Sequence, residues 1–185
     1  MPRPFALPIR RSPKSDPQQY RLYRMENEAI GACKAYRLSK TAIRAVIKAV
    51  CKNYGVPEPR IYWQDLGRWA AEWREHDLGM DGPSTIAFNT IKGTARDALT
   101  VTHELAHHIH YWLGEGAEGQ EPHGPEFMAC HMSILDSRRM IPVAGMRAVC
   151  EKYKIRYADP GDALSLPRLI KICRGKEQRG YRTNN

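Results

Sequence analysis

Residues 94–113 read Thr-Ala-Arg-Asp-Ala-Leu-Thr-Val-Thr-His-Glu-Leu-Ala-His-His-Ile-His-Tyr-Trp-Leu. Thr94 and Asp97 form an approximate capping box, which predicts a helix that begins at Thr94 and runs to the end of this stretch. At 100° per residue, the apolar side chains fall on one side of the helix, roughly 160–240° away from His103. The sequence therefore predicts an amphipathic helix that buries its apolar side and presents its histidines on the other.

This helix contains the segment His103-Glu104-Leu105-Ala106-His107, which matches the pattern H-E-x-x-H. Because a four-residue step returns nearly to the same helix face, both imidazoles can bind one metal ion. A catalytic zinc ion takes three protein ligands and keeps a fourth position for water. A third ligand must therefore come from elsewhere in the chain.

Three residues are candidates for the third ligand. His110 lies on the same helix face but one turn further on, where it is hard to combine with the first histidine. Glu126 follows His107 by 19 residues, a spacing that suits a carboxylate from a following helix. His123 follows His107 by 16 residues, within His-Gly-Pro-Glu-Phe at the start of that same helix. Spacing alone leaves the choice open.

Other elements are predicted around this helix. Ser39 can cap a helix whose apolar residues recur at helical spacing until Gly55. Segments rich in β-branched and aromatic residues predict strands over residues 60–66, 68–75 and 84–90. Two further helices are predicted over residues 125–139 and 142–153. We expect an α+β fold in which the three strands form an antiparallel sheet.

The two histidine motifs together resemble those of the SprT-like metallopeptidase family, which includes the Spartan proteases that digest proteins crosslinked to DNA. The resemblance covers roughly residues 38–135, from the capped helix to the helix after His-Gly-Pro-Glu-Phe. It implies a small zincin-like metalloprotease core, with a three-stranded antiparallel sheet packed on the H-E-x-x-H helix and further helices around them.

Carried over residue by residue, the resemblance implies that His103, His107 and His123 bind Zn²⁺. It implies that Glu104 is the catalytic glutamate, the general base that takes a proton from the attacking water. Glu126 then has no assigned role. The chain contains no Cys-x-x-Cys pair of the kind that forms a C-terminal zinc ribbon in many bacterial relatives. The implied protease core is therefore better supported than a role in DNA repair.

The charge of the chain is concentrated near its two ends. The net charge is +9, with about +5 in residues 1–24, about +5 in residues 165–185 and near neutrality between them. We interpret residues 1–19 as a proline-rich, disordered arm, residues 20–158 as the metallopeptidase domain and residues 159–185 as a basic tail. Basic tails of this kind favour polyanions, so DNA is an expected partner besides the protein or peptide substrate.

Composition excludes several classes of protein. No apolar run approaches the ~20 residues that cross a bilayer, and prolines interrupt the N-terminal apolar residues, which argues against a secretory signal. The five cysteines are widely spaced and odd in number, a pattern typical of reduced thiols. We therefore expect a cytoplasmic protein without membrane partners, associated with the nucleoid if the tails bind DNA.

Two other functions compete with the zinc peptidase of this family. In the first, the chain is a basic nucleic-acid-binding or assembly protein with a structural zinc, although such a site is normally closed by a fourth Cys or His ligand. In the second, Glu126 is the third ligand of a thermolysin-like peptidase. A zinc-bound structure that identifies the third ligand would separate these alternatives.

Overall fold

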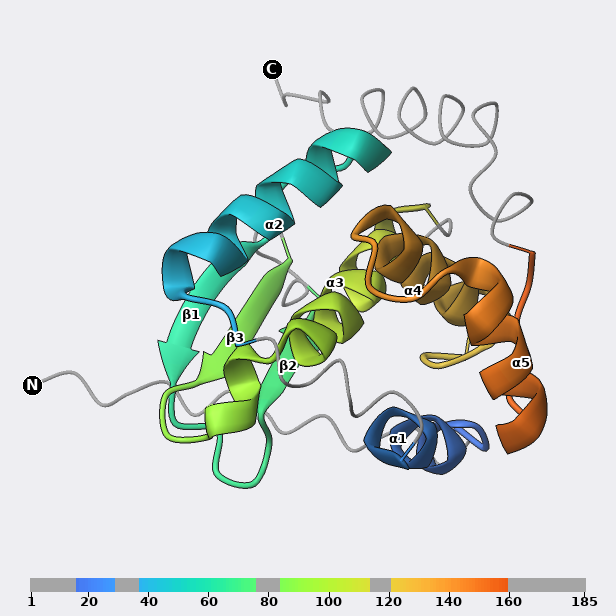
Figure 1. The fold of residues 1–185 in the computed structure, drawn as a ribbon. Coiled ribbons are helices and arrows are strands. Elements are labelled where there is room, and N and C mark those ends of the chain that lie inside the picture. Colours follow the sequence, from blue (N-terminus) through green and yellow to red (C-terminus); the bar gives the residue numbers. More distant parts are fainter. Residues whose placement is uncertain (1–15, 29–36, 76–83, 114–120, 160–185) are drawn as a thin grey trace, which may run out of the picture.

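The computed structural model describes residues 16–28, 37–75, 84–113 and 121–159, and their arrangement is shown in Figure 1. These residues form an α+β structure. Its elements are, in chain order, α1 (Gln19–Glu28), α2 (Lys40–Tyr54), β1 (Arg60–Gln64), β2 (Ala71–Arg74), β3 (Thr85–Asn89), the 3-10 helix η2 (Gly93–Arg96), α3 (Ala98–Leu113), α4 (Pro125–Ser137) and α5 (Val143–Tyr153).

Helix α2 forms where its end signals predict it. The Ser39 side chain accepts a hydrogen bond from the Ala42 N–H at 3.1 Å, which caps the first turn. Gly55 ends the helix in the left-handed region, at φ 64°, where a residue without Cβ is favoured. Ile43 and Ile47 lie on the buried side of the helix and join the core.

The sheet is mixed, with strand order β1-β3-β2. β2 pairs antiparallel with β3, but β1 pairs parallel with β3, so the expectation of an antiparallel sheet is wrong for β1. After β1 the chain forms β2 at the opposite edge of the sheet, and β3 then fills the central position between them. β3 is accordingly the most buried strand, since every residue from Ile86 to Asn89 is buried.

Helix α3 occupies the centre of the fold, in contact with β2, α2 and α4 (Figure 1). It begins at Ala98, later than predicted, because Asp97 is extended and residues Gly93–Arg96 form η2 instead. Val101 and Leu105 on the predicted apolar side are fully buried.

The opposite side of α3 is buried as well, contrary to the expectation that it faces outward. His103 is only 5% exposed and Glu104 only 8% exposed. Side chains of α1 and of the segment at the start of α4 contact this side, through Glu26 and His123. The helix that carries the motif is thus enclosed on both sides.

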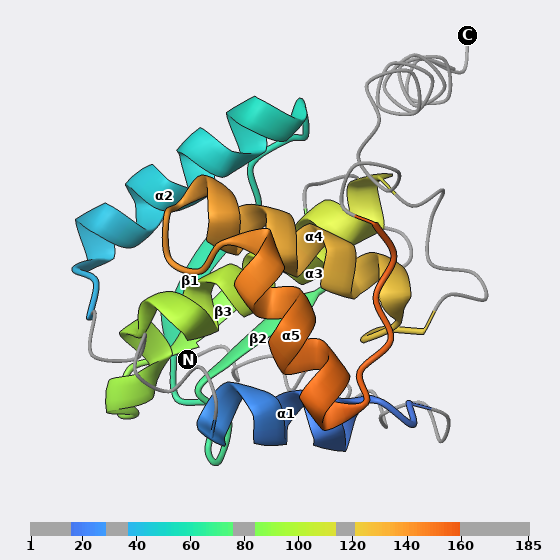
Figure 2. The same ribbon diagram turned by 45° about the vertical axis from the view of Figure 1, so that its right-hand side comes forward.

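Helices α1 and α5 lie side by side below α4 (Figure 2). Of the arm expected over residues 1–19, residues 1–15 lie outside the described residues, but residues 16–19 lead into α1 and are held in place. The Gln18 amide donates to the Arg156 carbonyl at 3.0 Å and accepts from the Arg156 N–H at 2.8 Å. The tail expected over 159–185 lies outside the described residues beyond Asp159.

Within the described part of the chain, none of the helices has the length and apolar character needed to cross a membrane.

Candidate metal centre

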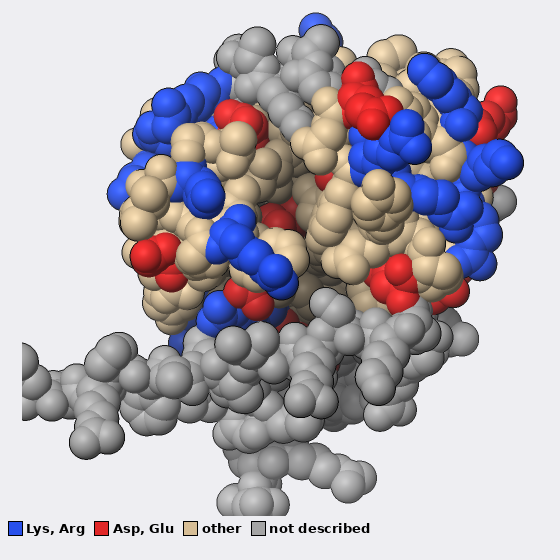
Figure 3. Space-filling model, turned by 90° about the horizontal axis from the view of Figure 1, so that it is seen from below, with Lys and Arg blue, Asp and Glu red and all other residues tan. Residues whose placement is uncertain are grey.

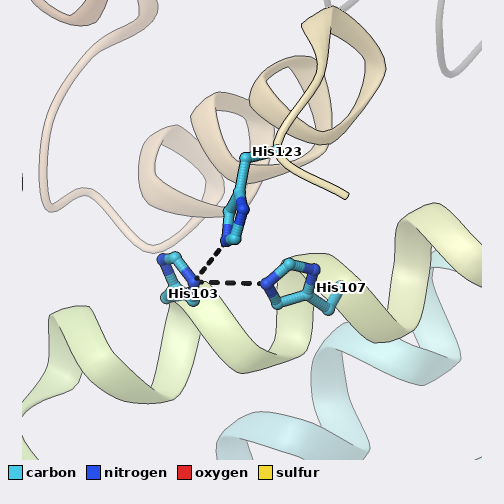
Figure 4. Close-up of side chains that lie close together, drawn as sticks. All are labelled: His103, His107 and His123. Carbon is cyan, nitrogen blue, oxygen red and sulfur yellow. Dashed lines mark hydrogen bonds between the residues drawn. The ribbon is translucent and has the colours of Figure 1, made fainter. Parts of the chain in front are cut away.

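Three histidines converge on one point from two parts of the chain (Figure 4). His103 and His107 lie one turn apart on α3, and His123 reaches them from the segment before α4. The Nε2 atom of His103 is 3.2 Å from Nε2 of His107 and 3.4 Å from Nε2 of His123. Their ligand atoms all lie within 4.8 Å of one another.

These separations suit a zinc ion. Tetrahedral zinc with Zn–N bonds of 2.0–2.1 Å places its nitrogen ligands about 3.3 Å apart. The donor set also fits, because three imidazoles are a ligand set of catalytic zinc sites. The residues that the structure brings together are therefore the three that the family resemblance implies as ligands.

The environment of His107 favours its neutral form. Its ring packs against Phe127, with centroids 4.4 Å apart, and lies nearly parallel to Trp73 at 6.0 Å. Burial, followed by the neighbouring charges of His123 and His103, holds the pKa of His107 well below its usual range. A neutral imidazole is the form that binds a metal.

Carboxylates hold the far nitrogens of the other two histidines. His103 Nδ1 donates to Glu26 Oε1 at 2.7 Å, and His123 Nδ1 donates to Asp16 Oδ2 at 2.5 Å. Burial alone would lower the pKa of His103, but the charge and hydrogen bond of Glu26 outweigh it and raise that pKa to about 9. Burial also lowers the pKa of His123, against the hydrogen bond to Asp16.

Glu104 lies beside the first ligand in a buried position. Its Oε2 accepts a hydrogen bond from the Trp73 N–H of β2 at 2.7 Å. Burial raises the pKa of Glu104 to about 7, although the His103 charge and the Trp73 hydrogen bond act in the opposite direction. A carboxyl with this pKa is matched to general acid–base work near neutral pH.

The other predicted candidates lie outside this convergence. Among the described residues, neither Glu126 nor His110 belongs to a group of side chains that could hold a metal. Glu126 lies in the first turn of α4, half-buried, and His110 is buried on α3. His108 points away from the centre and contacts Ser84 Oγ at 2.6 Å and the Pro57 carbonyl at 2.7 Å.

Four residues near the centre were not predicted from the sequence. Three belong to the segment around α1: Asp16, Tyr23 and Glu26. The Tyr23 ring lies 5.7 Å from that of His103 and 5.6 Å from that of His123, and burial raises its pKa to about 12. The sequence did contain one signal, since Asp16 followed by a proline is a typical helix start.

The fourth residue is His131, on α4, which is fully buried. Its Nδ1 lies 3.8 Å from Glu26 Oε1, and it forms with Glu26 and His103 a second group whose ligand atoms lie within 4.8 Å. Because Glu26 already accepts the hydrogen bond of His103 Nδ1, we interpret this group as an outer layer of the first centre. Burial lowers the pKa of His131 to about 4, so its ring is neutral.

Comparison of the chain with protein-family models, with curated proteins and with solved structures gave no match. The resemblance to SprT-like metallopeptidases therefore rests on the two motifs.

The buried Glu104 is expected to make the metal-free protein less stable as pH rises. A carboxyl with a pKa of about 7 in the folded chain, against an ordinary value of 4.5, binds its proton more tightly when folded. Stability then falls between these two pH values, by about 3 kcal/mol in total. Metal-free Glu104→Gln cannot titrate, so its free energy of unfolding should exceed that of the wild type at pH 8.

Urea denaturation of both proteins at pH 8 and pH 4.5 measures this difference, which should vanish at the lower pH. Glu58→Gln, a change at an exposed glutamate between α2 and β1, is the control and should differ little from wild type. Equal stabilities of wild type and Glu104→Gln at pH 8 would show that Glu104 carries no such penalty.

Proposed function

We propose that this protein is a zinc-dependent metalloendopeptidase of the SprT-like type. The observation that carries the proposal is the convergence of His103, His107 and His123 beside the buried Glu104. Three imidazoles leave a fourth zinc position for water or substrate. A carboxylate with a pKa near neutrality, one residue after the first ligand, provides the base that peptide hydrolysis needs.

In the proposed mechanism His103, His107 and His123 would hold the zinc ion, which when bound would act as a Lewis acid on the peptide carbonyl and on the attacking water. Glu104 removes the proton of the attacking water and passes it to the leaving amine. The Trp73 N–H holds Oε2 of Glu104 in place, which leaves Oε1 to carry the proton. This hydrogen bond also fixes the rotamer of the carboxylate.

The substrate requires an extended binding surface. A peptide cannot pair with β3, because β1 and β2 occupy both of its edges. β2 pairs with β3 alone among the described strands, and its Trp73 lies against Glu104. We therefore propose that an extended peptide adds to the edge of β2, which places its backbone beside the metal centre.

Cleavage of casein tests the proposal. The purified protein with one equivalent of zinc should cleave casein, lose activity in excess chelator and regain it when zinc is restored. Activity that persists without metal, or a zinc-loaded protein that cleaves no protein substrate, would contradict the proposal.

A structural zinc is the main alternative, and the number of ligands argues against it. Structural sites are closed by four Cys or His ligands. Within residues 16–28, 37–75, 84–113 and 121–159, the group contains three ligands and no fourth. The cysteines that these segments include, Cys51, Cys130 and Cys150, form no disulfide and are buried elsewhere in the core. Reduced thiols also suit the cytoplasmic location that we propose.

We further propose that nucleic acid binds near α1 and α5. A groove of about 500 Å³ lies between these helices, and its walls combine four cations, two tyrosines and one acid. Its lining residues are Tyr20, Arg21, Arg24, Glu28, Lys152, Tyr153 and Lys154. Lys and Arg gather on the right-hand side of Figure 3, where α1 and α5 lie. Hydrogen bonds join Gln18, just before α1, to Arg156, just after α5. The two basic terminal segments of the sequence continue from these neighbouring points of the chain.

Binding of single-stranded DNA should depend on these cations. Removing one cation that neutralises a phosphate lowers the slope of log affinity against log salt by about 0.7. Arg21→Ala and Lys152→Ala should each lower the slope by about that amount. Lys48→Ala should not, because Lys48 is an exposed residue of α2, which lies away from α1 and α5 (Figure 1). Fluorescence anisotropy at several salt concentrations measures the slopes. Equal slopes in all four proteins would exclude the groove as the binding surface.

The basic arm is tested by a shorter deletion than residues 1–19. Removing residues 1–14 deletes all four of its cations, Arg3, Arg10, Arg11 and Lys14. It keeps Asp16 and Gln18, which hydrogen-bond to His123 and which the longer deletion would remove. Deletion of residues 1–14 therefore removes the charge of the arm and keeps its contacts with the metal centre.

A further inference from the structure

Helix α1 lies outside the part of the chain that carries the family resemblance, yet it contacts two of the three candidate ligands. Asp16 lies in the segment that leads into α1, and Glu26 lies near the C-terminal end of the helix. Each carboxylate accepts the Nδ1–H of a different histidine, at 2.5 Å for His123 and 2.7 Å for His103. Both bonds lie on the side of the ring opposite Nε2, the nitrogen at the convergence.

Asp16 links the histidine to the start of the helix. Its Oδ2 holds His123, while its Oδ1 accepts hydrogen bonds from the backbone N–H groups of Gln18, at 3.3 Å, and Gln19, at 3.0 Å. One carboxylate therefore caps α1 and orients a ligand at the same time. Its side chain is only 5% exposed, so these contacts are shielded from water.

Gln18 holds the backbone of the same histidine. Its side-chain amide donates to the His123 carbonyl at 2.7 Å, and the whole Gln18 side chain is buried. His123 is thus fixed at its ring by Asp16 and at its main chain by Gln18. Because His123 comes from an irregular segment before α4, it lacks the rigid support that α3 gives to the other two ligands.

Glu26 has a matching role at the first ligand. Its side chain is 12% exposed and that of His103 is 7% exposed. A carboxylate buried to this degree is costly unless it is paired with hydrogen-bond donors or positive charge. The His103 Nδ1–H supplies the donor, and a zinc ion bound at Nε2 would add positive charge across the ring.

We infer that α1 is the positioning element of the metal centre, with Asp16 and Glu26 as its two positioning residues. By accepting the Nδ1–H groups, they fix the tautomer and the orientation in which both Nε2 lone pairs point at the zinc ion. The inference rests on the proposed zinc site. It adds that docking of α1 and binding of zinc are coupled, so that each strengthens the other.

The coupling has an expected size. Loss of a carboxylate behind a zinc-bound histidine weakens metal affinity by 10- to 100-fold. Because coupling between two sites is reciprocal, zinc must stabilise the docked position of α1 by the same factor that α1 contributes to zinc affinity. Both quantities are measurable without any assay of peptide cleavage.

The first measurement is the zinc dissociation constant, obtained by competition with a chromogenic chelator. Asp16→Ala and Glu26→Ala should each bind zinc about 10- to 100-fold more weakly than wild type. Asp16→Asn and Glu26→Gln should recover part of this loss, because the amide oxygen still accepts the Nδ1–H but carries no charge. Tyr20→Ala is the control, since this residue of α1 is 78% exposed and therefore adds little to the docking of the helix.

The second measurement is amide hydrogen exchange in α1 with and without zinc. Zinc should slow exchange of Gln19–Glu28 in the wild type, and this protection should shrink in Asp16→Asn and Glu26→Gln. These conservative variants keep the test valid if the alanine variants fail to fold. Thermal unfolding of each metal-free variant identifies such a failure.

The outcomes separate this inference from the proposed function. Wild-type zinc affinity in all the Asp16 and Glu26 variants would overturn the inference and leave the zinc peptidase intact. An equal loss of affinity in Tyr20→Ala would overturn it as well, because the effect would then reflect general stability of the helix. A wild-type protein that binds no zinc would overturn both. A zinc-binding protein without peptidase activity would contradict the proposed function alone.

Discussion

Glu104→Gln is expected to abolish peptide-bond cleavage, with a rate at least about 10²-fold below that of the wild type. Glutamine is nearly isosteric and its amide oxygen still accepts the Trp73 N–H that now binds Oε2. It has no basic group to take the proton of the attacking water. The zinc ligands are unchanged, so the variant should retain one zinc ion and the wild-type fold.

Casein cleavage and metal analysis on the same preparation test this prediction. Glu126→Gln makes the same chemical change in the His-Gly-Pro-Glu-Phe segment and serves as the control, which should retain activity. A Glu104→Gln variant that cleaves casein at the wild-type rate would show that another group acts as the base.

His123→Ala is expected to lower zinc occupancy and activity together. It removes one of three ligands and leaves His103 and His107, which bind a zinc ion far less tightly than a complete set. Glu126→Ala should retain close to one zinc ion, because Glu126 is not part of the convergence among the described residues. Together, the two variants show whether His123 or Glu126 is the third zinc ligand, a choice that residue spacing leaves open.

Zinc content after dialysis against a weak chelator measures both effects. Circular dichroism of the two variants shows whether a loss of zinc follows from unfolding. Zinc retained by His123→Ala but lost from Glu126→Ala would reverse the assignment and favour the thermolysin-like alternative.

Local signals predicted the parts of the fold that local physics determines. Ser39 and Gly55 mark the ends of α2 because capping depends on a few neighbouring backbone groups. The four-residue spacing of His103 and His107 places both on one face of α3 for the same reason. His123 was identified by a motif rather than by geometry.

The order of the strands could not be predicted in this way. Each strand was recognised from its own residues, but pairing depends on which edge the next strand joins. The run Ile86-Ala87-Phe88 is apolar without alternation, and in the structure β3 is the buried central strand. That pattern was the available sign that β3 does not lie at an edge.

The contribution of α1 was missed because composition outweighed a local signal. Five prolines in residues 1–19 suggested an arm without structure. Asp16 nevertheless caps a helix and contacts a residue 107 positions away. A contact of that range depends on the assembled fold, and the same holds for the burial of Glu26 against His103.

The most direct test of the central claim is a crystal structure of the zinc-loaded protein with anomalous data at the zinc edge. Our account predicts one strong zinc peak bound by Nε2 of His103, His107 and His123, with Glu104 beside it and outside the coordination sphere. A zinc ion bound by Glu126 in place of His123, or no zinc at this position in a protein that holds one equivalent, would contradict it.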